Sequence, residues 1–192
     1  MNMTFPGETR NVADAVTDPQ LRLLYGYWCS KKRGRAMPSR TDIDPVDLPG
    51  SLWPHLILLD VVPEDASGEA RGPRFRYRVL GSTFMHAFAR NPTGEFLDEA
   101  LPARNGYSEY VTGIYRDMVA LKKGIYTENS FTLDGQAVPM FTRRLSLPLS
   151  SDGETVNMAL ASALYEYDRS PIEGYLSDKT GFRAITRVVL DD

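Results

Sequence analysis

The chain has 192 residues, of which 42% are hydrophobic and 24% charged, values typical of one globular domain. Its 22 basic and 25 acidic residues give a formal charge of −3, which argues against nucleic acid or an anionic membrane as a partner. Two histidines and one cysteine exclude a disulfide framework, an iron–sulfur cluster and a Cys/His zinc site. The lone cysteine fits a reducing compartment, and no secretory signal or apolar run of about 20 residues is present, so we expect a cytoplasmic protein.

The first quarter of the sequence predicts an arm, a helix and a connector. Residues 1–20 are largely polar and aperiodic, so we expect a flexible arm there. Asp18-Pro19 supplies a helix N-cap and first helical position, and the basic residues before Gly34 supply a helix end. Residues 21–53 should therefore hold an amphipathic helix and a proline-rich connector. The helix has one apolar stripe, at i, i+3, i+4, i+7 and i+8: Leu21, Leu24, Tyr25, Trp28 and Cys29.

Two strands are predicted next. The apolar run LILLDVV at residues 56–62 has the length and composition of a buried strand. Residues 74–81, RFRYRVLG, alternate strictly and predict a half-buried antiparallel strand. In that strand we expect Phe75, Tyr77 and Val79 on the buried face and the three arginines on the other.

Two helices follow these strands. Residues 83–89 predict a short helix that Asn91-Pro92 ends. A longer helix is predicted over residues 105–123, with Asn105 as its cap and Lys122-Lys123-Gly124 as its end.

Three strand-like stretches complete the predicted core, at residues 125–133, 138–149 and 155–164, with turn signals between them. Residues 185–190 predict either an extra strand or a docking segment. The order of elements predicts an α+β fold: a five-stranded antiparallel sheet with helices on one face, plus the N-terminal amphipathic helix.

This order of elements resembles the PAS fold, and the local sequence resembles a single-domain bacterial PAS family found largely in alphaproteobacteria. The similarity extends from about Leu21 to Tyr167 and consists of several sequence blocks in the expected order. These blocks are YxYW, RGRxMPxRxDIDPxDLP and LWPHLxLLDV between residues 25 and 61, RFRYRVLG at 74–81, NPTG at 91–94 and RLSLPL at 144–149.

The resemblance implies a PAS-like core over residues 54–167 and a C-terminal extension over residues 168–192. PAS domains are sensory and interaction modules that hold a small molecule between sheet and helices, or dimerise through their flanks. We expect no output domain within this length, so a signal would pass through contact with a homodimer partner or another signalling protein.

The resemblance also allows a test of whether this sequence has the residues that the known PAS cofactors require. A haem-binding PAS domain generally supplies a histidine from the long helix, but residues 105–123 contain none and His86 precedes them. A light-sensing flavin domain needs a cysteine between the second strand and the long helix, whereas Cys29 lies on the first helix. Both haem and cysteinyl flavin are therefore disfavoured as cofactors. The sequence does not identify another cofactor.

A pocket between the long helix and the sheet is the main candidate site. A mostly apolar cavity with a few polar groups is what a small ligand requires. The alternative is an adaptor whose side chains fill a solid core. Pro139 and Pro148 leave the inward face of residues 138–149 ambiguous. The candidate lining residues are Tyr77, Tyr110, Ile114, Tyr115, Met118, Phe141, Arg143, Ser146, Met158 and Ser162.

Two surfaces are candidates for partner binding. The stripe of Leu21, Leu24, Tyr25 and Trp28 predicts either cover for the open face of the sheet or an interface with a second protomer. The arginine row at residues 74–78 predicts an anion or partner site, or an outer sheet face paired with neighbours such as Glu128.

A small enzyme of the isomerase or hydrolase type is the remaining alternative. Related α+β folds with cone-shaped cavities use an Asp–His pair. That function would require a buried carboxylate or histidine with a strongly shifted pKa. His55 and His86 show no spacing that suggests catalysis or metal binding, so we assign no catalytic residue and no metal site.

Overall fold

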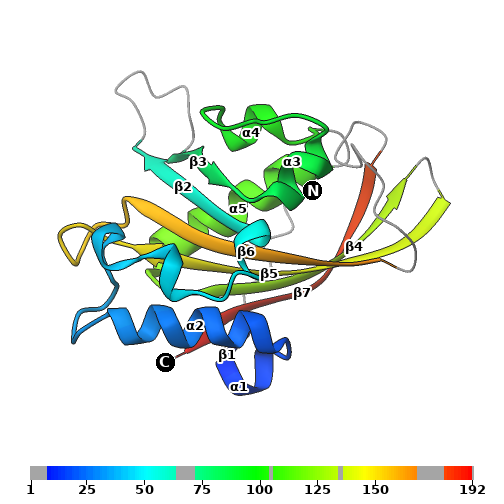
Figure 1. The fold of residues 1–192 in the computed structure, drawn as a ribbon. Coiled ribbons are helices and arrows are strands. Elements are labelled where there is room, and N and C mark those ends of the chain that lie inside the picture. Colours follow the sequence, from blue (N-terminus) through cyan, green and yellow to red (C-terminus); the bar gives the residue numbers. More distant parts are fainter. Residues whose placement is uncertain (1–7, 64–71, 104–105, 134–135, 168–179, 192) are drawn as a thin grey trace.

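The computed structural model describes residues 8–63, 72–103, 106–133, 136–167 and 180–191 (Figure 1). Seven strands form one mixed sheet in the order β1-β7-β4-β5-β6-β2-β3. The elements, in chain order, are β1 (Glu8–Asn11), α1 (Val12–Ala15), α2 (Pro19–Lys31), the 3-10 turns η1 (Arg40–Asp42), η2 (Pro45–Asp47) and η3 (Trp53–His55), β2 (Leu56–Val62), β3 (Arg74–Leu80), α3 (Ser82–Phe88), α4 (Leu97–Ala100), α5 (Tyr107–Leu121), β4 (Ile125–Leu133), β5 (Gln136–Leu149), β6 (Met158–Tyr167) and β7 (Thr180–Asp191).

The five predicted strands are β2 to β6, and every pairing between them is antiparallel. Two further strands make the sheet larger than predicted. β7 pairs antiparallel with β4, so residues 185–190 form the extra strand of the two alternatives. β1 pairs parallel with β7, and α1 follows it, so the expected flexible arm does not extend over residues 8–20.

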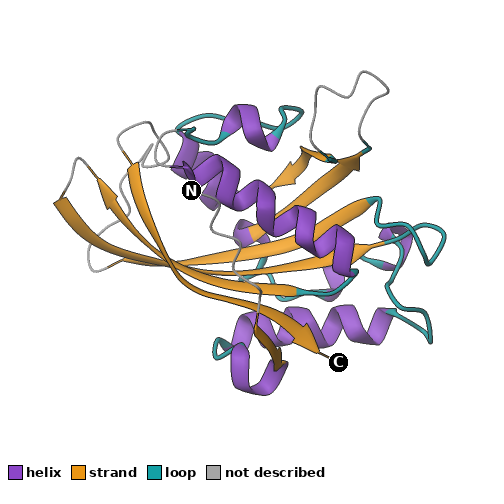
Figure 2. Ribbon diagram, turned by 180° about the vertical axis from the view of Figure 1, so that it is seen from behind, coloured by secondary structure: helices purple, strands orange, loops and turns teal. Residues whose placement is uncertain are grey.

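Helices cover both faces of the sheet, because the N-terminal helix α2 covers the open face, which is one of its two predicted alternatives. α5 crosses one face, and α2 lies under the opposite face (Figures 1 and 2). We refer to these as the α5 face and the α2 face. The ring of Phe84 on α3 contacts the ring of Tyr165 on β6, with centroids 5.7 Å apart. Within the described part of the chain, no helix has both the length and the apolar character needed to cross a membrane.

The α2 helix begins as predicted and ends at Lys31, with Arg33 in the left-handed conformation ahead of the predicted Gly34, and it is fixed to the sheet of its own chain. The Asp18 carboxylate accepts hydrogen bonds from the backbone N–H groups of Gln20 at 2.8 Å and Leu21 at 3.2 Å, which caps the helix. The indole Nε1 of Trp28 donates to the carbonyl oxygen of Pro148 on β5 at 2.9 Å. The predicted stripe is therefore buried against the sheet and is not exposed to a second protomer: Leu21, Leu24, Tyr25 and Trp28 are at most 9% exposed.

A β-bulge in β3 changes the predicted alternation of that strand. Leu58 pairs with Val79 and Leu59 pairs with Tyr77, so Arg78 is an extra residue between them. The extra residue inverts the faces beyond it. Val79 is consequently 50% exposed, not buried as predicted, and Leu80 is buried in its place.

The end of α5 also differs from the prediction. The left-handed residue after the helix is Lys122, with φ 55°, not Gly124. Gly124 instead packs closely against Leu147, because a Cβ at this position would lie 3.1 Å from Cδ2 of Leu147. The helix begins after Gly106, and the predicted cap Asn105 lies outside the described residues, as does the predicted turn at 134–135.

The loop between β5 and β6 is a carboxylate-capped turn. Asp152 accepts hydrogen bonds from the backbone N–H groups of Glu154 at 2.9 Å and Thr155 at 2.7 Å, and Gly153 has φ 85°. These contacts hold residues 150–155 in the turn, so β6 starts at Met158 and not at the predicted residue 155.

Candidate functional site

The central strands β4 and β5 present buried polar side chains toward α5. In β5, Arg144 and Ser146 alternate with leucines, and cross-strand pairs join Thr127 to Arg144 and Asn129 to Thr142. Directly paired residues share one face of a sheet. The set forms one polar patch, and each member is at most 6% exposed: Thr127, Asn129, Thr142, Arg144 and Ser146.

The Arg144 guanidinium lies at the centre of this polar patch and is surrounded by tyrosines. A long hydrogen bond, 3.5 Å from Nη2, joins it to the Tyr107 hydroxyl of α5. Burial lowers the pKa of Arg144, but its interactions with Tyr107, Tyr115, Tyr165 and Tyr77 raise it overall, so the side chain keeps its charge.

The tyrosines do not neutralise this charge. Burial raises the pKa of Tyr77 well above its ordinary value and also raises the pKa of Tyr115, in both cases against the opposing effect of Arg144. Their hydroxyl groups are therefore protonated at neutral pH. A protonated hydroxyl can donate or accept a hydrogen bond, but it carries no negative charge.

Several polar atoms at this site have no hydrogen-bond partner among the described residues. Buried polar atoms are nearly always satisfied in proteins, and each one left unsatisfied costs about 1–3 kcal/mol. Here three unsatisfied atoms lie together on the face of β4 and β5 that points toward α5: Thr127 Oγ1, Asn129 Oδ1 and Arg144 Nε.

A family model for the PAS domain matches residues 16–159. The chain belongs to the PAS domain family. The match begins just before α2 and ends at the start of β6, so the whole polar patch lies within it, while β1 and β7 lie outside. The comparison with curated proteins and the comparison with solved structures each gave no match.

In this PAS domain, half of the predicted lining residues lie on the α5 side of the sheet in the buried core. Tyr115, Ile114 and Met118 on α5 are at most 1% exposed, and Ser146 is fully buried on β5. Tyr77 on β3 is also buried. Tyr110 is only partly buried; its ring contacts Phe182 of β7, with centroids 5.1 Å apart.

The other predicted lining residues point toward α2. Arg143 pairs with Glu128, and Phe141 lies two positions before Arg143, so both belong to the opposite face. Ser162 pairs with Leu145, and Met158 pairs with Leu149, which also places them there. Side chains three positions apart in a strand lie on opposite faces, so Arg143 and Ser146 could not have lined one pocket.

The PAS domain residues missed by the sequence prediction are therefore Arg144, Thr127, Asn129, Thr142 and Tyr107. The alternation in the sequence groups Arg144 with Ser146, but it does not say which face of the strand points toward α5. Leu145 and Leu147 form an apolar row in RLSLPL, and the alternating row contains Arg144 and Ser146.

The three arginines of the row at residues 74–78 pair with carboxylates. In the arginine row, Arg74 pairs with Asp98 at 2.8 Å, while Arg76 and Arg78 lie 3.2 and 3.3 Å from Asp60. The predicted partner Glu128 instead lies 3.5 Å from Arg143.

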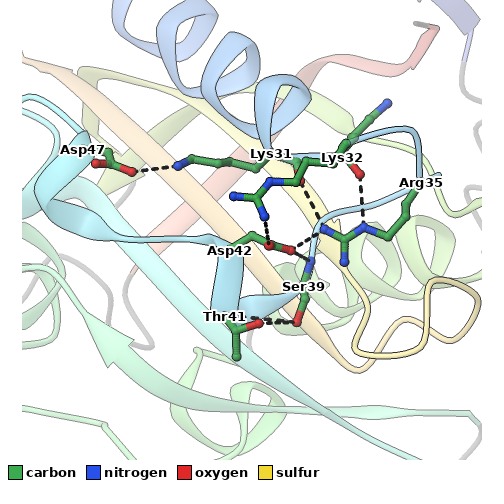
Figure 3. Close-up of polar contacts among 8 residues, drawn as sticks. Lys31, Lys32, Arg35, Ser39, Thr41, Asp42 and Asp47 are labelled. Carbon is green, nitrogen blue, oxygen red and sulfur yellow. Dashed lines mark hydrogen bonds and ion pairs between the residues drawn. The ribbon is translucent and has the colours of Figure 1, made fainter.

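The basic run that ends α2 is held by the connector. Lys31 contacts Asp47 at 2.8 Å, and Arg35 contacts Asp42 (Figure 3). Asp42 is itself fixed by Ser39 in a reciprocal capping box. In the described part of the chain, no group of three or more His, Cys, Asp or Glu side chains is placed to hold a metal ion.

Proposed function

We propose that this PAS domain is a sensory module that binds a small molecule between α5 and the central sheet. The observation that supports this is the cluster of unsatisfied polar atoms on the face of β4 and β5 that points toward α5. A solid core would leave the free-energy cost of these atoms uncompensated, whereas a bound ligand would satisfy them. The polar patch contains no carboxylate or imidazole, so these residues supply a binding surface and not a general base.

The signal would leave through the flanks of the sheet. Thr127 and Asn129 lie on β4, which pairs with β7, and β7 pairs with β1. A ligand that favours one packing of α5 on the sheet would shift the position of these edge strands. The receiver would be a second copy or another signalling protein in the cytoplasm, and it would contact a surface other than the buried α2 stripe.

An adaptor with a solid core is the second candidate. Two exposed apolar side chains favour it, because Trp53 is 49% and Val46 77% exposed on neighbouring turns of the connector. Trp53 Nε1 donates to the Pro45 carbonyl at 2.9 Å, which holds the indole beside that turn.

Native mass spectrometry and a melting screen against small metabolites separate the two candidates. The sensor predicts a bound mass in the purified protein or a raised melting temperature with at least one compound class. Ser146→Ala should weaken that effect. Ser162→Ala is a matched control, because Ser162 is equally buried but lies on the α2 face.

A chain of unmodified mass whose melting temperature no compound raises would favour the adaptor. Light scattering tests the dimer separately: we expect twice the chain mass, and a monomer mass over a wide concentration range would refute it.

A further inference from the structure

We propose that the ligand of this site carries one carboxylate, and that the Arg144 guanidinium binds it. This inference rests on the proposed function and adds the chemical class of the ligand. The inference starts from the buried positive charge of Arg144, which no carboxylate of the described residues pairs with.

Arg144 differs from the other buried or half-buried arginines of the sheet. In the described residues no carboxylate forms an ion pair with it, and no aromatic ring stacks on it. Arg187 of β7 lies on the same face, since both residues pair with Thr127, but it is neutralised by Asp117 of α5. A buried charge without a partner is strongly unfavourable, so Arg144 is the position where an anion from solution would stabilise the fold.

The groups around Arg144 are suited to the remaining oxygen lone pairs of a carboxylate. Thr127 lies directly across the strand pair, and Ser146 and Thr142 flank Arg144 on its own strand. The Thr127 hydroxyl has no partner in the described residues and is free to donate, and the Ser146 hydroxyl lies within reach of the Tyr115 hydroxyl. The planar guanidinium supplies two parallel donors, which match the two oxygens of one carboxylate.

The charge count favours a carboxylate over a phosphate. A phosphate monoester carries about −1.5 to −2 at neutral pH. Arg144 is the one cation of the polar patch, and Arg187 is already paired. A monoanion balances a single guanidinium, whereas a dianion would leave a buried negative charge.

The packing above the polar patch favours an apolar body for the ligand. Ile114 and Met118 of α5 are fully buried, and the Tyr115 ring contacts the Phe75 ring with centroids 5.3 Å apart. The expected ligand is therefore a small monocarboxylic acid with an aliphatic or aromatic remainder.

The test uses the full chain, dialysed free of small molecules, with melting temperature and calorimetry as readouts. The probes are straight-chain monocarboxylates from acetate to octanoate and benzoate. Each is compared with its neutral amide, and phenyl phosphate serves as the dianionic probe. We expect at least one carboxylate to raise the melting temperature while its amide does not.

Three variants locate the effect. Arg144→Met should weaken carboxylate binding at least about thirtyfold, the usual consequence of truncating a buried charge pair. Arg144→Lys keeps the charge but loses the paired donors, and we expect about tenfold weaker binding. Arg143→Met is the matched control on the neighbouring residue of the α2 face, and it should bind like the wild type.

The outcomes separate this inference from the proposed function. If only neutral compounds bind, or if Arg144→Met binds carboxylates normally, the carboxylate proposal is overturned while a sensory pocket stands. Preference for phenyl phosphate over every carboxylate overturns it in the same way. If no small molecule binds at all, both the inference and the proposed function fail.

Discussion

Arg143 and Arg144 are neighbours on β5, yet the two faces of the sheet give them opposite surroundings. Arg143 points to the α2 face, where it pairs with both Glu128 and Glu166. Arg144 points to the α5 face, where it meets tyrosines and the unsatisfied Thr127 hydroxyl. Among the described residues, the charge of Arg143 is therefore paired with carboxylates and that of Arg144 is not, and the proposed binding site would account for this difference.

Trp28→Ala should have the largest effect, because it opens the tightly packed α2 face. The substitution removes a side chain that is 2% exposed and its hydrogen bond to Pro148. We expect the free energy of unfolding to fall by about 3–5 kcal/mol in chemical denaturation. Leu23→Ala on the same helix is the control, since Leu23 is 44% exposed.

Substitution of Arg144 or Arg143 by methionine should change the free energy of unfolding in opposite directions. Replacing the unpaired Arg144 removes a buried charge, so Arg144→Met should raise the free energy of unfolding of the ligand-free protein by about 1–4 kcal/mol. Arg143→Met breaks a partly exposed ion pair and should lower it by about 0.5–1 kcal/mol. Destabilisation of equal size by both substitutions would contradict the difference between the faces.

Two tyrosine hydroxyls provide a finer comparison. The Tyr126 hydroxyl donates to Glu128 at 2.7 Å, so Tyr126→Phe should lower the free energy of unfolding by about 1 kcal/mol. The Tyr110 hydroxyl is buried and has no partner among the residues that the structure describes, and burial raises the pKa of Tyr110 to about 12. Tyr110→Phe should therefore leave stability unchanged or slightly higher, and a loss as large as that of Tyr126→Phe would argue against this difference.

The smallest expected effect is a pH dependence at His55. Burial lowers the pKa of His55 below its ordinary value of 6.5, against an opposing backbone contact with Ala163. Below about pH 6.5 the unfolded chain binds the proton more readily than the folded chain. His55 thus contributes full stability above that pH and loses it as the pH falls. The slope of unfolding free energy against pH in this range should flatten in His55→Gln, and an unchanged slope would contradict the prediction.

Local patterns in the sequence were enough to predict α2 and the strands β2 to β6. Asp18-Pro19 specifies the start of α2 by a capping hydrogen bond, which depends on nearby residues alone. The run at 56–62 forms β2 with the predicted bounds, because a short apolar run between turn signals has few other structures available.

The inward face of β5 and the outer strands could not be predicted in this way. A shift of one residue moves every side chain of a strand to the other face, and the sequence contains no marker of register. The bulge at Arg78 depends on how β2 aligns with β3, and β1 depends on a strand at the other end of the chain. These features are set by distant residues, which is why the candidate site was only partly predicted.

The parallel pairing of β1 with β7 has a consequence for how the molecule assembles. Glu8 pairs with Val188, so the first described strand is completed only when the last one is in place. During synthesis the N-terminal segment leaves the ribosome early and must wait for β7 before it can pair. Closure of this edge should be a late step that depends on contacts distant in sequence, and such contacts slow folding.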